Sequence, residues 1–343
     1  MERTGSAPIY VQCNPLLDIS AHVDEAFMKK YDVQPASAAL CSEEQKPIYA
    51  DLENQKDVCY IPGGSGLNTA RVAKWMSGKK APVTYVGCIA DDKYGGILKS
   101  SAEKEGVTMN LEYTEKEATG TCAVCINGKE RSLVANLAAA NCISGKHIAS
   151  PAVQASINGS KIFYLTGFTL TINVEYVLTV AKAAHAVGGL FMMNLSAPFI
   201  IQFFGEQLKQ VLPYVDIIFS NEDEAAAFSE AQGFGTKDIK EIAQKAAALP
   251  HEGPKDRLVV FTQGKDATIF ATKDKVEEVV VPAIAAEKIV DTNGAGDSFV
   301  GGFLAALAAD KPIARCCEAG NYAAGVIIQH DGCTFPATPD FTI

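Results

Sequence analysis

The sequence predicts an α/β protein in which helices cover both faces of a mostly parallel central sheet, a three-layer α/β/α arrangement, with a small β-rich lid added to it. Short apolar segments recur along the 343 residues, and most are followed by a stretch of helical periodicity. Strands that alternate with helices form parallel sheets covered on both faces. Two regions break this alternation, and a glycine-rich turn precedes an uncharged helix near the carboxyl end, as in α/β ligand sites.

The strands of the main sheet are predicted from apolar runs. Residues 8–13 and 83–88 are two of these runs, and the amphipathic pattern of residues 70–76 predicts a helix between them. Period and length separate the two kinds of element, because strands are short and helices repeat about every 3.6 residues. Further strands are expected at residues 161–165, 190–194, 215–219 and 258–261, and further helices at 174–187 and 237–249.

The lid is predicted from the two irregular regions. Residues 19–62 lack clear α/β alternation, and residues 121–136 alternate like two strands joined by Asn127-Gly128, a dipeptide typical of tight hairpins. We expect these regions to pair in space over the edge of the main sheet. The chain then divides into a large nucleotide- and substrate-binding domain, residues 1–18, 63–118 and 139–343, and a small lid, residues 19–62 and 119–138.

Composition excludes several classes of partner. The content of 48% hydrophobic residues supports a full core, and a net charge of −10 argues against nucleic-acid binding. The start of the chain lacks the basic and apolar regions of a signal peptide. The apolar stretch 188–204 carries Asn194, Ser196 and Pro198, which favours a buried strand, a loop and a helix over a membrane span. We therefore expect no membrane association.

The ten cysteines are scattered through a long chain, which favours reduced thiols in the cytoplasm over a disulfide framework. Cys122 and Cys125 have the CxxC spacing of a zinc site, but no second pair matches them. The surrounding alternation predicts a strand there.

The turn formed by Gly294, Ala295 and Gly296 is the most informative feature of the chain. It stands before Asp297 and the uncharged stretch 298–309, and residues 288–290 predict a short strand leading into it. Such a turn presents backbone N–H groups to an anion, and glycine lets a phosphate approach. A carboxylate placed at an anion site suggests a general base for a nucleophile that attacks phosphorus.

Other interpretations of this turn compete with that one. The turn could be structural, with Asp297 as the cap of the following helix. A dinucleotide-binding fingerprint would need a third glycine where Phe299 stands, and no Walker A sequence occurs in the chain.

A second glycine-rich segment, Gly63-Gly64-Ser65 followed by Asn68, precedes the helix at residues 70–76. Asp18 closes the first strand region. Carboxyl ends of strands in such sheets bind ligands, and a carboxylate can accept hydrogen bonds from two neighbouring hydroxyls, as in a ribose diol. The alternative is an ordinary turn or cap.

DTNGAGDSFVGGF, from Asp291 to Phe303, resembles the carbohydrate-kinase signature of the ribokinase (PfkB) family. The segments CNPLLDIS, ERSLVANLAAAN, NLSAPF, FTQGKD and DGCTFP extend the similarity over essentially the whole chain, towards the members that phosphorylate adenosine. The resemblance implies a ribokinase-like fold, ATP and Mg²⁺, and transfer of the γ-phosphoryl group to the 5′-hydroxyl of adenosine, a step of purine salvage. It also implies a monomer with small-molecule partners.

The resemblance further implies roles for individual residues. Asp297 would be the catalytic base, the amides of Gly294, Ala295 and Gly296 the anion hole, and Arg131 would reach the transferring phosphate. The substrate would contact Asn14, Leu16, Asp18, Leu40, Gly63, Gly64, Ser65, Asn68, Leu133, Ala135, Phe168 and Asn293, with the ribose at the polar residues and the adenine between the apolar ones. ATP would contact Asn221, Thr262, Gly264, Asn321 and Phe335, and Glu224 would bind Mg²⁺ indirectly, through water.

Alternatives remain for some of these roles. Arg131 could be a solvated hairpin residue, and Asn221 to Glu224 an acidic helix start favoured by the macrodipole. Thr169 and Asn321 depart from the mammalian pattern of a second aromatic and a histidine. Activity on another nucleoside or a sugar, or nucleoside binding without catalysis, also stays open.

Overall fold

A computed structural model describes residues 5–35, 37–128 and 130–343. Residues 1–4 of the expected large domain and residues 36 and 129 of the expected lid lie outside the described residues. No helix within the described ranges is long and apolar enough to cross a membrane.

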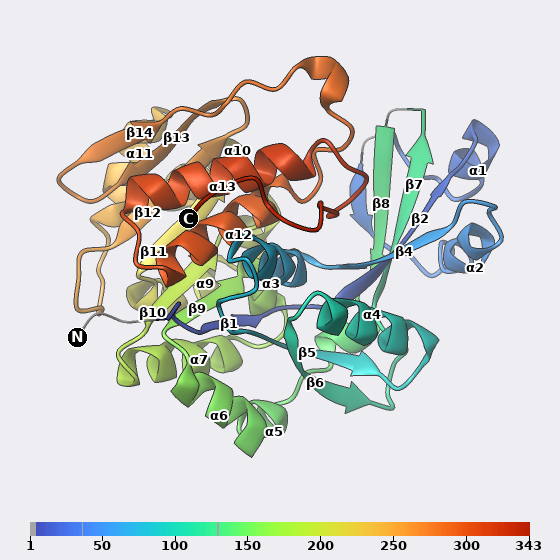
Figure 1. Cartoon of the computed structure of the whole chain (residues 1–343), viewed down its shortest axis with the longest axis horizontal. Helices are drawn as coiled ribbons and strands as arrows, with labels where there is room; N and C mark the ends of the chain where they lie inside the picture. Colours follow the sequence, from blue (N-terminus) through green and yellow to red (C-terminus); the bar gives the residue numbers. More distant parts are fainter. Residues whose placement is uncertain (1–4, 36, 129) are drawn as a thin grey trace.

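The main sheet has nine strands in the order β14-β13-β12-β11-β10-β9-β1-β5-β6 (Figure 1). Strands from β12 to β6 are parallel, and β13 and β14 add an antiparallel edge. The mostly parallel sheet is as predicted, because strands buried on both faces read as continuous apolar runs. The strands are β1 Ile9–Gln12, β5 Val83–Ala90, β6 Thr108–Thr114, β9 Ile162–Thr166, β10 Leu190–Asn194, β11 Ile217–Asn221, β12 Leu258–Gln263, β13 Asp266–Ala271 and β14 Val276–Val279.

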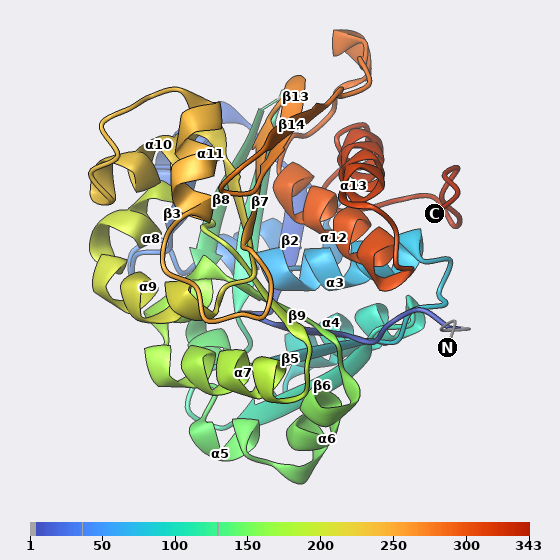
Figure 2. The ribbon, with the colours of Figure 1, turned by 90° about the vertical axis from the view of Figure 1, so that its left-hand side faces the viewer.

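Helices cover both faces of this sheet, as Figure 2 shows in edge view. Two separate apolar clusters lie between the sheet and the two helical layers. A Cβ at Gly302 would overlap Ala319 of α13, so glycine there lets α12 and α13 pack closely. The helices are α3 Ser65–Met76, α4 Lys93–Lys104, α12 Ala295–Ala308 and α13 Ile313–Ile327 on one face, and α5 Gly145–Ile148, α6 Pro151–Gly159, α7 Val174–Ala186, α8 Pro198–Phe203, α9 Gly205–Val211, α10 Glu222–Ala231 and α11 Ile239–Ala247 on the other.

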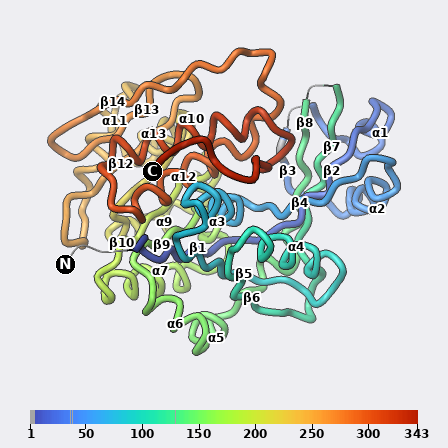
Figure 3. The backbone as a smooth tube through the Cα atoms, viewed as in Figure 1, coloured from blue at the N-terminus to red at the C-terminus, as the bar shows by residue number. Residues whose placement is uncertain are grey.

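The two irregular regions pair in space, as predicted, into a second sheet of order β3-β8-β7-β2-β4. It stands beside the main body, on the right in Figure 3, and has its own apolar cluster beneath α1 (Glu25–Lys30) and α2 (Ile48–Glu53). The β7–β8 hairpin is antiparallel, with Cys122 opposite Ala135. The strands are β2 Leu16–His22, β3 Ala38–Leu40, β4 Cys59–Gly63, β7 Thr121–Asn127 and β8 Glu130–Asn136.

The predicted strand at residues 288–290 is wrong. Residues Ala286–Lys288 form a short 3-10 helix, and the Val290 N–H bonds to the carbonyl of Ile328 instead of to a neighbouring strand. The chain here crosses from the sheet edge at β14 to α12, and the side chains of Ile289 and Val290 are 41% and 42% exposed. Ile and Val favour strands, but no strand of the described residues lies beside Ile289 and Val290 to pair with them.

Candidate active site

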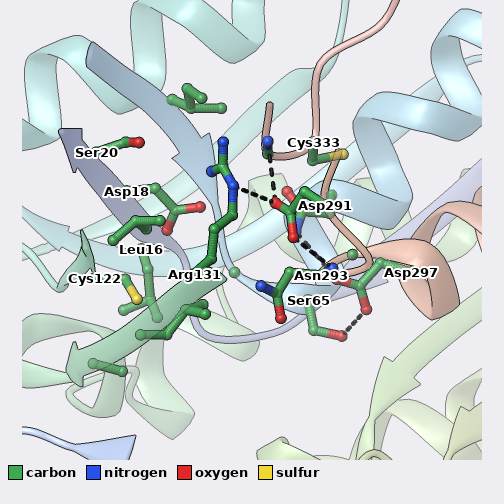
Figure 4. A pocket seen from close by; sticks show the side chains of 18 of the residues that line it. Leu16, Asp18, Ser20, Ser65, Cys122, Arg131, Asp291, Asn293, Asp297 and Cys333 are labelled. Carbon is green, nitrogen blue, oxygen red and sulfur yellow. Dashed lines mark hydrogen bonds and ion pairs between the residues drawn. The ribbon is translucent and has the colours of Figure 1, made fainter. Parts of the chain in front are cut away.

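One pocket lies between the small sheet and the amino ends of α3 and α12 (Figure 4). Both glycine-rich segments and the hairpin contribute to it, although they lie far apart in the sequence. Predicted site residues that line this pocket are Leu16, Asp18, Gly64, Ser65, Asn68, Arg131, Leu133, Ala135, Asn293, Gly294 and Asp297.

The turn before α12 has the geometry of an anion site. Gly294 has φ +76°, a left-handed conformation that favours glycine, and α12 begins at Ala295. The first N–H groups of a helix have no partner within the helix and can face an anion. Among the described residues the N–H groups of Gly294 and Gly296 have no backbone partner, whereas the Ala295 N–H donates to the Thr292 carbonyl at 3.3 Å. A Cβ at Gly296 would meet nothing within 4 Å. The packing of the protein alone therefore does not require glycine at Gly296.

Asp297 is held in place by α3. The Ser65 hydroxyl donates to Asp297 Oδ1 at 2.6 Å, and Asn68 Nδ2 donates to Oδ2 at 3.1 Å. Burial raises the pKa of Asp297, although these two hydrogen bonds oppose the shift. A carboxylate with a raised pKa accepts a proton more readily. The site therefore contains an oriented carboxylate at the edge of an anion-binding turn.

Asp18 lies in the same pocket, but no side chain of the described residues fixes its carboxylate by a hydrogen bond. Burial raises its pKa to about 7, while Arg71 and Arg131 lower it. Among the described residues its carboxylate has no hydrogen bond or ion pair, and Figure 4 shows it facing the cavity. A Cβ at Gly63 would overlap this carboxyl group, which explains the glycine in β4. A partly buried acceptor without a partner is suited to hydroxyl donors from a ligand.

Arg131 joins the small sheet to the main body. Its side chain is buried, with Nε 3.3 Å from Asp291 Oδ2 and Nη2 bonded to Asp331 Oδ1. Asp291 opens the same DTNGAGD segment as Asp297, but sequence reasoning gave it no role. The signal available was a second carboxylate in a motif already singled out.

The apolar wall was also only partly predicted. Leu133 and Ala135 on β8 lie opposite Val124 and Cys122 on β7, and all four line the pocket. Period-two alternation combined with the hairpin register could have found the β7 pair. The lining residues that sequence reasoning missed are Ser20, Ala39, Ile61, Cys122, Val124, Asp291, Gly332 and Cys333.

Four predicted substrate contacts do not line the pocket, namely Asn14, Leu40, Gly63 and Phe168. Leu40 is 65% exposed on β3, and the Phe168 ring lies 6.1 Å from that of Phe199. Asn14 is buried, and its Nδ2 donates to Asn141 Oδ1 at 2.7 Å.

The predicted ATP and metal residues lie outside the pocket too. Asn221 and Glu224 form a capping box at the start of α10, and burial raises the pKa of Glu224 to about 7. Thr262 pairs with Asn221 across the β11–β12 ladder, and Gly264 follows in the next turn with φ +56°. Asn321 accepts a hydrogen bond from Thr268 at 2.8 Å.

Phe335 packs against the core. Its ring stacks on Trp75 with centroids 5.0 Å apart, and Arg71 lies over it.

The site combines a helix start with N–H groups that can face an anion, an oriented carboxylate and a second carboxylate that faces the cavity, an arrangement that suits a phosphotransferase with an alcohol acceptor. Residues 29–340 match the model of the pfkB family carbohydrate kinases, and the chain belongs to this family. It is 44% identical to "Adenosine kinase 2" of Arabidopsis thaliana over 329 residues, 96% of this chain and 95% of that protein.

Solved structures agree. The apo adenosine kinase of Trypanosoma brucei brucei is 52% identical, with a TM-score of 0.92 over 95% of this chain and 100% of that one. The adenosine kinase of Anopheles gambiae, in complex with P1,P4-di(adenosine-5) tetraphosphate, is 44% identical, with a TM-score of 0.89 over 97% and 98%.

Proposed function

We infer that this chain is an adenosine kinase, which transfers the γ-phosphoryl group of ATP to the 5′-hydroxyl of adenosine and releases AMP and ADP. The observation that carries the inference is the pairing, in one pocket, of a held carboxylate at an anion-binding turn with an unpartnered carboxylate beside an apolar wall. The near full-length similarity to adenosine kinases at 44% and 52% identity supports this substrate and a role in purine salvage.

The two carboxylates, Asp18 and Asp297, have different proposed roles. Asp18 accepts hydrogen bonds from the ribose hydroxyls, with Ser65, Asn68 and Gly64 around the sugar, and this contact fixes the 5′-hydroxyl near the turn. Leu16, Leu133 and Ala135 provide the apolar surface against the base. Asp297 then takes the proton of the 5′-hydroxyl as that oxygen attacks the γ-phosphorus in line.

Negative charge develops on the phosphoryl oxygens during this transfer. Fixed donors aimed at that charge lower the barrier because they need no reorganisation. The amides of Gly294, Ala295 and Gly296 supply such donors, and Arg131 supplies a cation. Asn293 lines the same edge of the pocket.

Mg²⁺ and the rest of ATP belong outside the pocket proper. Mg²⁺ binds few protein ligands and keeps its waters, and it would neutralise phosphate charge. Glu224 fits an indirect role, since one of its oxygens caps α10 and the other has no partner among the described residues. The proposed ATP contacts remain Asn221, Thr262, Gly264, Asn321 and Phe335, and the outer substrate contacts Asn14, Leu40, Gly63 and Phe168.

We also propose a monomer in the cytoplasm. All ten cysteines are free thiols in the structure, in keeping with a reducing compartment.

The test is AMP formation from ATP across adenosine, inosine, guanosine and ribose. We expect rapid turnover with adenosine, slower turnover with the other nucleosides and none with ribose. Preferential phosphorylation of ribose would assign a sugar kinase, and absence of turnover with all four acceptors would leave only nucleoside binding.

A further inference from the structure

Arg131 is the only cation of the pocket lining, and in this structure two carboxylates occupy it within the described ranges. The cation comes from β8 of the small sheet, whereas Asp291 precedes α12 and Asp331 follows α13. The contact therefore joins the small sheet to the main body at the pocket wall.

The two carboxylates differ in how firmly they are held. Asp291 has a side chain 3% exposed, and it accepts hydrogen bonds from the N–H groups of Asn293 at 2.8 Å and Gly332 at 3.3 Å. The Asp331 side chain is 73% exposed, and Arg131 is its one polar partner among the described residues. Removing Asp291 from Arg131 would leave a buried charge, while releasing Asp331 returns a carboxylate to water.

We propose that Asp331 is a competing anion that holds Arg131 while no phosphate is present and yields the guanidinium when ATP binds. The proposal rests on the proposed function, because it takes the transferring phosphate to be the ligand of Arg131. Asp331 thereby acts on phosphoryl transfer through Arg131 and is a positioning residue.

The geometry supports replacement of Asp331, but not of Asp291, by a phosphate at Arg131. A guanidinium binds a phosphate best through two parallel N–H donors, and Asp331 occupies Nη2. Asp291 occupies a different nitrogen, Nε, and is itself buried, so it can keep Arg131 at the pocket wall while Nη2 exchanges its partner (Figure 4). Even if Asp331 stayed nearby, its negative charge would repel the phosphate, so its presence lowers ATP affinity in either position.

The experiment is a calorimetric titration of the full-length protein with MgATP. Asp331→Asn removes the charge and keeps the shape, and Asp331→Glu restores the charge. Asp340→Asn is the matched control, since Asp340 is also exposed on the carboxyl-terminal segment and has no contact with Arg131. Exposed ion pairs contribute up to about 1 kcal/mol, so Asp331→Asn should bind MgATP about two- to fivefold more tightly.

The same titration in an Arg131→Gln background shows whether Asp331 changes MgATP affinity through Arg131 or through the overall charge of the protein surface. We expect Asp331→Asn to have no effect there, Asp331→Glu to match the parent, and Asp340→Asn to change nothing. An unchanged or weaker affinity in Asp331→Asn overturns the proposal, as does an equal gain in Asp340→Asn or in the Arg131→Gln background. Loss of AMP formation by the parent with MgATP binding intact would instead refute the proposed function.

Discussion

At the residue scale, Asp297 and Asp18 are two carboxylates in one pocket with opposite surroundings. Asp297 is fixed by Ser65 and Asn68, whereas the Asp18 carboxylate has no hydrogen bond or ion pair within the described part of the chain. A base needs a fixed position relative to the proton it removes, and a binding group needs free acceptor sites. Their environments therefore assign the two roles more sharply than their side-chain type does.

The base is tested by Asp297→Ala. Adenosine affinity should stay within a few-fold, because the ribose contacts remain, and kcat should fall by about 10²–10⁴, the usual contribution of a general base. Steady-state kinetics together with adenosine titration measures both quantities. More than about a tenth of the parent activity in a folded variant contradicts the assignment.

The ribose contact is tested by Asp18→Ala. Loss of charge-assisted hydrogen bonds to the diol should weaken adenosine binding by about 1.5–3 kcal/mol and abolish discrimination against 2′- and 3′-deoxyadenosine. Ser20→Ala, on the same strand and in the same pocket, is the control and should retain discrimination. If Asp18→Ala still prefers adenosine over both analogues as the parent does, Asp18 does not hold the diol.

The raised pKa of Asp18 also predicts how stability depends on pH. Its pKa is about 7 in the ligand-free fold and about 3.9 when unfolded. Between these values the folded state binds more protons, so this group makes stability fall as pH rises from about 4 to 7. Asp18→Asn removes this term and should gain stability relative to the parent as pH rises. Thermal unfolding without ligand from pH 5 to 8 checks this, and parallel curves for the two proteins would refute it.

At the scale of elements, the site depends on the joint between α3 and α12. The buried Thr69 hydroxyl lies 3.1 Å from the carbonyls of both Ser65 and Asp297, and so links the first turns of the two helices. A joint of this kind sets where the base stands relative to the sugar site.

Thr69→Val keeps the shape and removes this link. Unfolding free energy should fall by about 1 kcal/mol. Misplacement of the base should lower kcat several-fold with little change in the adenosine KM, because chemistry is more sensitive to position than binding is. The control is Thr179→Val on α7, whose hydroxyl bonds within its own helix. Equal kinetic effects in both variants would exclude a role for the joint.

The sequence predicted correctly those elements whose own residues carry the signal, such as an apolar run or a turn dipeptide. β9 is buried throughout and reads as an apolar run, and Asn127-Gly128 marks the hairpin. Residues 288–290 failed because strand formation needs a neighbour that local sequence does not reveal. The glycine turn was found from its own residues, whereas the partner Asp331 lies 200 residues from Arg131. Contacts of that kind are set by the assembled fold.

At the scale of the whole molecule, the small sheet has a core of its own. Its buried apolar cluster, which includes Ile19, Leu52 and Val134, shares no buried residue with the two clusters of the main body, although Tyr60 and Tyr94 pack against both it and one of them. Two of the connections to the body are short: three residues lie between β1 and β2, and one residue lies between β4 and α3. We interpret this sheet as the lid of the pocket.

Hydrogen exchange tests the lid. Adenosine contacts both the small sheet and the main body, so bound adenosine should slow exchange in residues 19–62 and 121–136, outside residues 36 and 129, by joining the two parts. Strands β10 and β12 lie deep in the main sheet, where opening already needs near-global unfolding, and should change little. We propose that bound adenosine draws the small sheet further over the pocket and aligns Arg131 with the phosphate, so ATP hydrolysis without adenosine should be slow. Uniform protection along the chain, or rapid ATP hydrolysis in the absence of nucleoside, would show that the small sheet does not gate the reaction.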